Sequence, residues 1–566
     1  MFNASPSAAS AQHPREFTVY DPIANARYYR WRFFTVFARA IQIVWLFGHF
    51  AIQLQFDRWS GQVEKNTQQR AKQFSAILTN LGPASIKIGQ ALSTRPDLVP
   101  QDYLDELVIL QDQLPSFSSK VAFQIIEDEL GRSLGSIYAE ISPEPIAAAS
   151  LGQVYKATLH NGDRVAVKVQ RPELRKRLNL DLYLLRLASG WLERVLPLKL
   201  GHSLTLVVDE FGAKLYEEID YLNEARNAEK FAANFFDDPE IKVPQIYWAY
   251  TNRRVITMEW IDGYKLTDTA SIQAAGLDVN NLIRLGVTSG LRQLLEHGFF
   301  HADPHPGNLF AMPDGRMAYI DFGMMDQLDE PVKETIASAV VQLINNDYQG
   351  LADDFVSLGF LTPDVDLVPI VPALQKVLGQ GLGQSVANFN FKTITDEFSD
   401  LMYEYPFRIP AKFALIIRSI VTQEGVALSL NPNFKIVEVS YPYVSRRLLT
   451  EESPAMRRRL VEVLFKGGKF QWERLENMIA IAQSEGNFDI VPTAKMGLQY
   501  LLSDEGRYLR HQLLNALTEN DTLHTDELQR IWQLVKDDLP PQRMFGVAFD
   551  TLRQMSALQM TAILPG

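Results

Sequence analysis

The sequence of 566 residues contains no cysteine. This absence excludes disulfide bonds, a thiolate nucleophile and cysteine-ligated zinc, and it agrees with a reducing compartment. Residues 1–16 also lack the short apolar core and the small-residue cleavage site of a secretory signal. We therefore expect a cytoplasmic protein.

Positive charge is also scarce. The chain has 55 Lys and Arg against 67 Asp and Glu, for a net charge of -12. Neutralising the phosphates of a nucleic acid requires clustered cations, so we expect no nucleic-acid partner. Hydrophobic residues at 46% and charged residues at 22% are typical of globular proteins, and the length predicts two or more packed lobes.

No long apolar run is free of polar residues. The most apolar segment, 33–56, is interrupted by Arg39, Gln42, His49, Gln53 and Gln55. A spanning helix needs roughly 18 apolar residues without charge, so we predict no transmembrane helix. The segment is expected to lie either on the protein's own core or on the inner face of a membrane. The flanking arginines, together with Trp31 and Trp45, suggest the membrane surface.

Helical and strand patterns follow one another along the chain. Residues 60–135 have helical periodicity, interrupted by turn signals such as Gly82-Pro83. Two strands at 153–159 and 164–170 flank the turn at 160–163, which predicts a β-hairpin. Further patterns predict helices over 173–198, 203–234 and 280–297, a strand over 254–261, a loop and hairpin over 300–323, and helices from there onward.

The densest motif is His301-Ala302-Asp303-Pro304-His305-Pro306-Gly307-Asn308, followed 13 residues after Asn308 by Asp321-Phe322-Gly323. Phosphoryl transfer needs an Asp near the attacking oxygen, an Asn and an Asp as magnesium ligands, and a strand Lys on the phosphates. Asp303 and Asn308 have the five-residue spacing of a kinase catalytic loop, and Asp321 begins the Asp-Phe-Gly. Lys168 lies in Val165-Ala166-Val167-Lys168, close to the Val-Ala-Ile-Lys strand of kinases. The pattern predicts ATP and Mg²⁺ as cofactors, with Asn308 and Asp321 holding the metal.

The order of the motifs along the chain also assigns the remaining parts of a kinase-like site. We expect Glu224 to form the ion pair with Lys168. We expect adenine to bond the backbone of Glu259, Trp260 and Ile261 beside Met258, and Asp303 to orient or deprotonate an acceptor, which can be water. The rival interpretation, a hydrolase metal held by His301, Asp303 and His305, leaves the strand lysine and the Asp-Phe-Gly unexplained.

These motifs predict an α+β, protein-kinase-like fold with two lobes, a small antiparallel sheet in the first and helices in the second. The predicted parts are an N-terminal segment with the apolar helix (1–59), a helical extension (60–135), the first lobe (136–262), the second lobe (263–445) and a C-terminal helical extension (446–566).

Two usual kinase features are missing. An alanine-rich stretch, Ala147-Ala148-Ala149-Ser150, stands where a Gly-rich loop would cover the phosphates, and alanine disfavours positive φ. We therefore expect a stiffer loop. No Ala-Pro-Glu follows the Asp-Phe-Gly, and a helix is expected near Glu330, so a platform for peptide substrates is lacking.

At these residues the chain resembles the UbiB (ADCK-like) family of atypical protein-kinase-like proteins, over about residues 60–445. Lys87-Ile88-Gly89-Gln90 matches its Lys-x-Gly-Gln motif, Glu218-Ile219-Asp220 its Glu-x-Asp motif, and the alanine-rich loop and catalytic loop match as well. The resemblance implies that the extension folds across the active site and that Lys87 pairs with Glu218 or Asp220. It makes Lys87, Gly89, Gln90, Glu218 and Asp220 regulatory residues.

The resemblance also implies a function. It implies that the protein is an ATPase or small-molecule kinase that supports isoprenoid-quinone metabolism. The implied ligands are prenylated quinone precursors or lipid, and the implied partners are quinone-biosynthesis enzymes. Residues 451–566 predict no spanning helix, as in cyanobacterial and plastid-type members. Two alternatives remain open, a small-molecule kinase of the aminoglycoside or choline kinase type and a non-catalytic ATP-gated scaffold.

Overall fold

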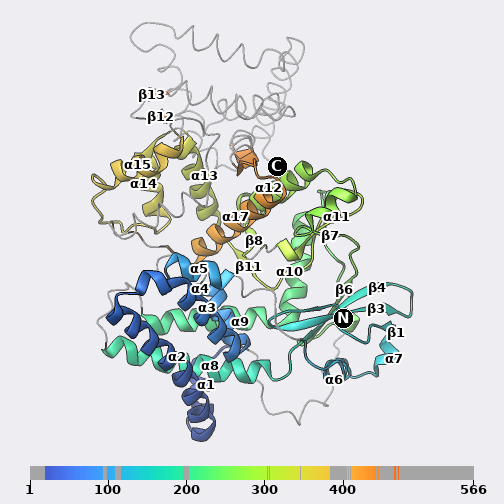
Figure 1. Cartoon of the computed structure of the whole chain (residues 1–566). Coiled ribbons are helices and arrows are strands. Elements are labelled where there is room, and N and C mark those ends of the chain that lie inside the picture. Colours follow the sequence, from blue (N-terminus) through green and yellow to red (C-terminus); the bar gives the residue numbers. More distant parts are fainter. Residues whose placement is uncertain are drawn as a thin grey trace, which may run out of the picture. The chain divides into compact units, whose positions relative to one another are not determined.

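The computed structural model describes residues 19–92, 99–108, 116–195, 203–302, 304, 306–344, 346–382, 405, 407, 409–436, 439–440, 443–444, 465–466 and 469–470 (Figure 1). The chain divides into two compact units. The first consists of residues 1–268 and 307–325, and the second of residues 269–306 and 326–566. The fold is α+β, as the sequence predicted.

A five-stranded antiparallel sheet organises the first unit. Its strands run in the order β1-β3-β4-β6, and β2 pairs with β3. Their bounds are β1 (Tyr138–Ile141), β2 (Ala147–Ala148), β3 (Gly152–Leu159), β4 (Arg164–Gln170) and β6 (Val255–Glu259). Gly162, with φ of 91°, closes the β3–β4 hairpin in a conformation that favours glycine. The three predicted strands and the turn are confirmed.

Strand alternation gives this sheet two different faces. Val165, Val167 and Val169 of β4 are fully buried against α6 (Ser119–Leu130), which contributes Ala122 and Ile126. Lys168 lies between these valines in the sequence, so its side chain projects from the other face. The sheet thus separates a hydrophobic core from the face that carries the lysine.

The helices after the hairpin are α8 (Leu174–Val195), α9 (Leu204–Glu218) and α10 (Tyr221–Asn234). The sequence predicted one continuous helical pattern over 203–234, and the structure breaks it at 219–220. Asp220 is extended there, and its side chain accepts a hydrogen bond of 3.1 Å from the Leu222 backbone N–H. Capping by a short carboxylate starts a new helix at this point.

A second, four-stranded sheet in the same unit presents the catalytic-loop end and the Asp-Phe-Gly. Its order is β5-β10-β9-β7, with bounds β5 (Ile241–Lys242), β7 (Tyr264–Lys265), β9 (Leu309–Ala311) and β10 (Met317–Tyr319). The ring of Phe231 on α10 packs 4.9 Å from Tyr319 and 5.3 Å from Phe322, measured between ring centroids. This aromatic cluster fastens the Asp-Phe-Gly turn to α10.

The N-terminal helices of this unit are α1 (Pro22–Tyr29), α2 (Phe33–Ser60), α3 (Val63–Leu81), α4 (Pro83–Leu92) and α5 (Gln101–Val108). Gly61, with φ of 65°, ends α2, so that α3 turns back to pack beside it (Figure 1). Proline at the first position of α4 follows Gly82, as the turn signal predicted. Two short elements complete the unit, α7 (Leu134–Ile137) and η2 (Trp248–Tyr250).

The second unit is mostly helical where the structure describes it. Its helices are α11 (Thr269–Ala274), α12 (Val279–Leu295), α13 (Glu330–Ile344), α14 (Tyr348–Ser357), α15 (Ile370–Leu382) and α17 (Ala411–Leu430). The short elements are β8 (Phe299–His301), η3 (Pro306–Asn308), β11 (Met325–Gln327), β12 (Phe465–Lys466) and β13 (Lys469–Phe470). The chain passes from one unit to the other within η3 and within β11. The other residues of the predicted extension 446–566 lie outside the described part.

Two described helices, α2 and α17, are long and apolar enough to cross a membrane by length and composition. The sequence predicts no transmembrane helix. The test is weak, because a core helix of a soluble protein also passes it, and 44% of the apolar window of α17 is buried. The corresponding window of α2 is only 6% buried. Most of α2 is therefore not covered by the described parts of the chain.

The contact between α6 and the sheet gives a test of the fold. Ile126 is fully buried there, whereas Val121 on the same helix is 41% exposed. We expect Ile126→Ala to lower the free energy of unfolding by about 2 to 5 kcal/mol, because it leaves a cavity under β4. Val121→Ala should change it by less than about 0.5 kcal/mol. Urea titrations followed by circular dichroism measure both, and equal effects would contradict this packing.

Candidate active site

Lys168 lies between two carboxylates. Its Nζ donates to Glu224 Oε1 at 2.7 Å and to Asp321 Oδ2 at 3.2 Å. The Glu224 side chain is only 2% exposed, and that of Lys168 15%. Strand β4, helix α10 and the Asp-Phe-Gly turn therefore meet at this lysine. The partner that the sequence predicted for Lys168 is the one found.

The electrostatics of this trio are coupled. Burial raises the pKa of Glu224 to about 7, and although Lys168 opposes the rise, the nearby charges of Asp321 and Glu218 add to it. Burial acts to lower the pKa of Lys168, but the Asp321 and Glu224 carboxylates outweigh burial and hold the pKa well above its ordinary value. The lysine thus stays charged at neutral pH, whereas the raised pKa of Glu224 is close to neutral pH.

Asn308 immediately precedes β9, and Asp321 follows β10, the antiparallel neighbour of β9 in the second sheet. The Gly323 N–H donates to Asp321 Oδ1 at 2.9 Å, and the Ile320 N–H donates to the Asn308 carbonyl at 3.1 Å. The first bond fixes the Asp321 rotamer, and the second brings Asn308 beside the residue that precedes Asp321. Both side chains present hard oxygen donors, which Mg²⁺ prefers.

The carboxylates around Lys168 outnumber the lysines beside them. Glu218, Glu224 and Asp321 supply three carboxylates against the two lysines Lys87 and Lys168. Glu224 Oε2 is buried and has no hydrogen-bond partner in the described structure. Buried carboxylate oxygens are costly unless paired. Of these groups, the Asp321 carboxylate, together with the Asn308 side-chain oxygen, offers ligands of the kind that Mg²⁺ prefers.

Helix α4 carries the Lys-x-Gly-Gln residues Lys87, Gly89 and Gln90. Ala84 of this helix is buried with Leu178 of α8 and Leu215 of α9, which fixes α4 against both. Lys87 Nζ then forms an ion pair with Glu218 Oε1. Of the two partners that the resemblance implied, Glu218 is the one found, because the Asp220 side chain is used to cap α10.

Glu218 also lies next to the Asp-Phe-Gly. A methyl group added at Gly323 would be 3.7 Å from Glu218 Cγ and 3.9 Å from Glu224 Oε2. The Lys87–Glu218 pair is therefore adjacent to the trio around Lys168. The extension and the candidate active site form one charged network within the first unit.

The alanine-rich loop is tied to the sheet at several points. Ala147 and Ala148 pair with β3, and the Ala149 N–H donates to the Gly152 carbonyl at 2.8 Å. The Arg171 guanidinium donates from Nε and Nη2 to the Ala149 carbonyl at 3.1 and 2.9 Å. Ser150, the last residue of the stretch, is 8% exposed. The loop is braced by an arginine that sequence reasoning missed, since no spacing rule marks it.

Gly152 is the one glycine left in this region, and its place explains why. A methyl group there would be 2.4 Å from the Tyr221 hydroxyl and 2.5 Å from the Val169 carbonyl oxygen, both closer than real contacts allow. Tyr221 begins α10, and Lys168 Nζ lies 5.3 Å from the centroid of its ring. The glycine allows the loop to approach the base of α10.

The segment predicted for adenine is partly occupied by the sheet. The Glu259 N–H donates to the Gln245 carbonyl at 2.8 Å, and the Trp260 N–H donates to the Arg164 carbonyl at 3.0 Å. Adenine could therefore pair only with the remaining backbone groups, such as the Ile261 N–H. Met258 pairs with Ala166 in the β4–β6 register and shares the face of Lys168.

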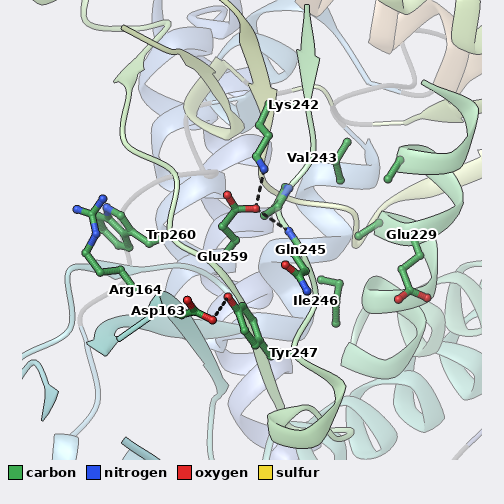
Figure 2. A pocket seen from close by; sticks show the side chains of 13 residues that line it. Asp163, Arg164, Glu229, Lys242, Val243, Gln245, Ile246, Tyr247, Glu259 and Trp260 are labelled. Carbon is green, nitrogen blue, oxygen red and sulfur yellow. Dashed lines mark hydrogen bonds and ion pairs between the residues drawn. The ribbon is translucent and has the colours of Figure 1, made fainter. Parts of the chain in front are cut away.

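A pocket of about 560 Å³ lies beside β6 (Figure 2). Its wall includes Glu259, whose carboxylate accepts from Lys242 Nζ at 2.7 Å, together with Glu229 and Tyr247. Glu259 points into this pocket in Figure 2, and none of Lys168, Glu224 and Asp321 lines it. The pocket therefore shares Glu259 and Trp260 with the segment predicted for adenine, but not the residues around Lys168.

Three residues of the predicted catalytic loop are not seen in this site. Asp303 and His305 lie outside the described residues. His301 is 2% exposed in β8 of the second unit, where its backbone N–H donates to Gln293 Oε1 at 2.9 Å. No group of three His, Asp or Glu side chains that could hold a metal occurs in the described parts of the chain.

A strand lysine paired with a helix glutamate and with the aspartate of an Asp-Phe-Gly defines a protein-kinase-like protein. Comparison with known proteins refines this class. Residues 109–355 match the ABC1 atypical kinase-like domain, and residues 374–435 match the UbiB helical domain. The chain belongs to the ABC1/UbiB family of atypical kinases, as the resemblance indicated, and it is of the cyanobacterial and plastid type.

Its relatives include the uncharacterized protein slr1919 of Synechocystis, which is 65% identical over 96% of each chain. Arabidopsis thaliana has the chloroplastic protein ACTIVITY OF BC1 COMPLEX KINASE 1, which is 47% identical over 89% of this chain and 76% of its own. Among solved structures, the Mycobacterium tuberculosis Rv3197–erythromycin complex aligns with 68% of this chain and 97% of its own, with a TM-score of 0.46 and 24% identity.

The raised pKa of Glu224 makes stability depend on pH. Its folded-state pKa of about 7 exceeds the ordinary value of 4.5, so the stability it contributes is full below pH 4.5 and is lost as pH rises through 7. Glu224→Gln cannot ionise, so its free energy of unfolding should fall less than that of the wild type between about pH 5 and 8, by on the order of 2 kcal/mol. Urea titrations at several pH values measure this.

The matched control is Glu229→Gln, an exposed carboxyl on the same helix. This variant should keep the wild-type dependence of stability on pH. If Glu224→Gln also kept it, the buried carboxyl would not titrate near neutrality.

Proposed function

We propose that the chain binds Mg-ATP and transfers its γ-phosphoryl group, as an atypical kinase or ATPase that supports isoprenoid-quinone metabolism. The observation that carries the proposal is the trio of Lys168, Glu224 and Asp321, joined at 2.7 and 3.2 Å. Bringing three charges together at low exposure is costly, and a structural core does not require it. A triphosphate with its metal accounts for the arrangement.

Each residue has a role in the proposal. Lys168 binds the phosphates and is kept in place by Glu224. Asn308 and Asp321 hold magnesium, which neutralises charge that develops on the transferred group. Met258 contacts the base, the backbone of Glu259 to Ile261 offers its remaining groups, and Asp303 orients or deprotonates the acceptor hydroxyl or water.

The acceptor in this proposal is small. Arg171 braces the loop over the phosphates, and α4 lies beside the Asp-Phe-Gly through the Lys87–Glu218 pair. A protein substrate therefore finds little room next to Asp321. We assign Lys87, Gly89, Gln90, Glu218 and Asp220 to a regulatory contact that occupies this place.

The wider setting rests on family membership. We include a prenylated quinone precursor or related lipid as ligand, quinone-biosynthesis enzymes as partners, and a membrane surface as the place of action. The match to the ABC1 domain, rather than the catalytic loop alone, favours this setting over an aminoglycoside or choline kinase.

Replacing the proposed metal ligand tests the chemistry. Asp321→Ala should reduce the rate of magnesium-dependent ATP hydrolysis by about 100-fold or more, because loss of one ligand removes several kcal/mol of transition-state stabilisation. Asp314→Ala removes an exposed carboxylate from the β9–β10 turn and should keep the wild-type rate. Phosphate release by the purified protein measures both, and normal turnover by Asp321→Ala would refute the assignment.

A second replacement distinguishes an enzyme from an ATP-gated scaffold. Asp303→Asn keeps the size of the side chain but removes the base, so ATP hydrolysis should fall by about 10²-fold to 10⁴-fold while Mg-ATP affinity stays within a few-fold. Calorimetric titration and turnover are measured on the same preparation. Unchanged turnover would favour the scaffold, in which ATP binding alone matters.

A further inference from the structure

Helix α2 has apolar side chains on two opposite faces. The inner face packs on α3, where Phe47 and Phe50 lie 6.1 and 5.8 Å from Phe74 between ring centroids. The outer face leaves large apolar side chains between 51% and 77% exposed, namely Phe33, Phe37, Ile41, Trp45, Ile52 and Phe56. Their spacing of four or seven residues places them in one stripe along the helix. A stripe of this size on a soluble surface marks an interaction site.

The charge around the stripe has one sign. Residues 22–60 contain five arginines and a single acidic residue, Asp57, in a chain whose net charge is -12. Arg39 is bonded to Asp181, and Asp57 to Arg70. Of the other four arginines, Arg30, Arg32 and Arg58 are exposed at the two ends of α2, and Arg27 is exposed on α1. The surface is therefore positive near both ends of α2 and mostly apolar between them.

Tryptophans accompany this pattern. Trp31, Trp45 and Trp59 are 85%, 77% and 88% exposed. The indole ring has an apolar body and a polar N–H, so it favours the boundary between lipid headgroups and acyl chains. The apolar stripe, the tryptophans and the arginines together are typical of a helix that binds the surface of an anionic bilayer.

A second copy of the chain fits this surface less well. If two α2 stripes packed in parallel, Arg30 and Arg32 would meet their own copies, and in an antiparallel pair they would meet Arg58. Either arrangement brings like charges together, which weakens association. Anionic headgroups remove this repulsion, since they attract the arginines at both ends.

Ion pairs on the inner face decide how α2 can meet a bilayer. Arg70 of α3 donates from Nε to Asp57 at 2.5 Å, and Arg39 donates from Nε to Asp181 of α8 at 2.8 Å. A spanning α2 would therefore draw α3 with it, and α3 begins with the polar sequence Val-Glu-Lys-Asn-Thr-Gln-Gln-Arg. Such side chains are expensive in hydrocarbon. Only the outer face is available to lipid.

We propose that the outer face of α2 lies in the plane of an anionic lipid bilayer, with Trp45 and Ile52 among the acyl chains and the four arginines on the headgroups. The helix lies on the membrane and does not cross it. This inference does not depend on ATP turnover. Its tests measure binding and depth, so their failure is distinct from a failure of the proposed chemistry.

Vesicle flotation tests the contact with the full chain. The protein should float with vesicles of phosphatidylcholine and phosphatidylglycerol, and less with phosphatidylcholine alone or at high salt. The double variant Trp45→Glu with Ile52→Glu should lose at least about tenfold in binding. Phe236→Glu changes an aromatic residue that is 92% exposed outside α2, and it should bind as the wild type does.

Depth can be measured because the chain has no cysteine. Nitroxide labels on Phe37→Cys, Trp45→Cys and Phe56→Cys should become accessible to oxygen and protected from a nickel chelate when anionic vesicles are added, all at one shallow depth. A label on Phe236→Cys should stay aqueous. A label at 45 deeper than those at 37 and 56 would show a spanning helix and overturn the proposal.

Two further results would also overturn it. One is equal flotation of the double variant and the wild type. The other is a wild-type dimer without vesicle binding that Trp45→Glu converts to monomers in sedimentation equilibrium, because this would assign the stripe to a second copy. Because the substituted residues are exposed, unchanged thermal unfolding of the variants should confirm that the fold is retained.

Discussion

The ion pair between Lys168 and Glu224 constrains the first unit more than any other contact. Two charges at 15% and 2% exposure are tolerated only when their partners are within hydrogen-bond distance. Strand β4 must therefore be held beside α10, and the Asp-Phe-Gly turn must bring Asp321 to the same lysine. The capping of α10 by Asp220, the contact of the Phe231 ring with the Phe322 ring and the glycine at 152 all serve this convergence.

Two other contacts distinguish the chain from ordinary kinases. An arginine braces the loop that would otherwise be a flexible glycine-rich flap, and a lysine from the extension pairs with a glutamate beside the Asp-Phe-Gly. Both contacts tie the region around the proposed phosphates to neighbouring elements, which supports the proposal of a small acceptor or water over a polypeptide.

Helix α2 shows how a single sequence segment can serve two environments. Its inner face is fastened by ion pairs and aromatic contacts to its neighbours, while its outer face carries exposed large apolar side chains with arginines near its ends. Neither face alone would distinguish a core helix from a membrane helix. Their combination does, because the inner contacts forbid insertion and the outer ones favour lipid.

The sequence by itself determined the local elements and the list of chemical groups. Hairpin β3–β4, strand β6, helix α12 and the residues Lys168, Glu224, Asn308 and Asp321 could be named in advance, since turn chemistry, strand alternation and motif spacing are local properties. The sequence did not predict the break at 219–220, because a capping carboxylate inside a helical pattern is easily taken for an ordinary helical residue. Only the tertiary structure decided that Glu218 rather than Asp220 pairs with Lys87, that Arg171 braces the alanine-rich loop, and that α2 has an uncovered face. These outcomes depend on which distant side chains are brought within 3 or 4 Å of one another, and neither spacing nor periodicity along the chain contains that information.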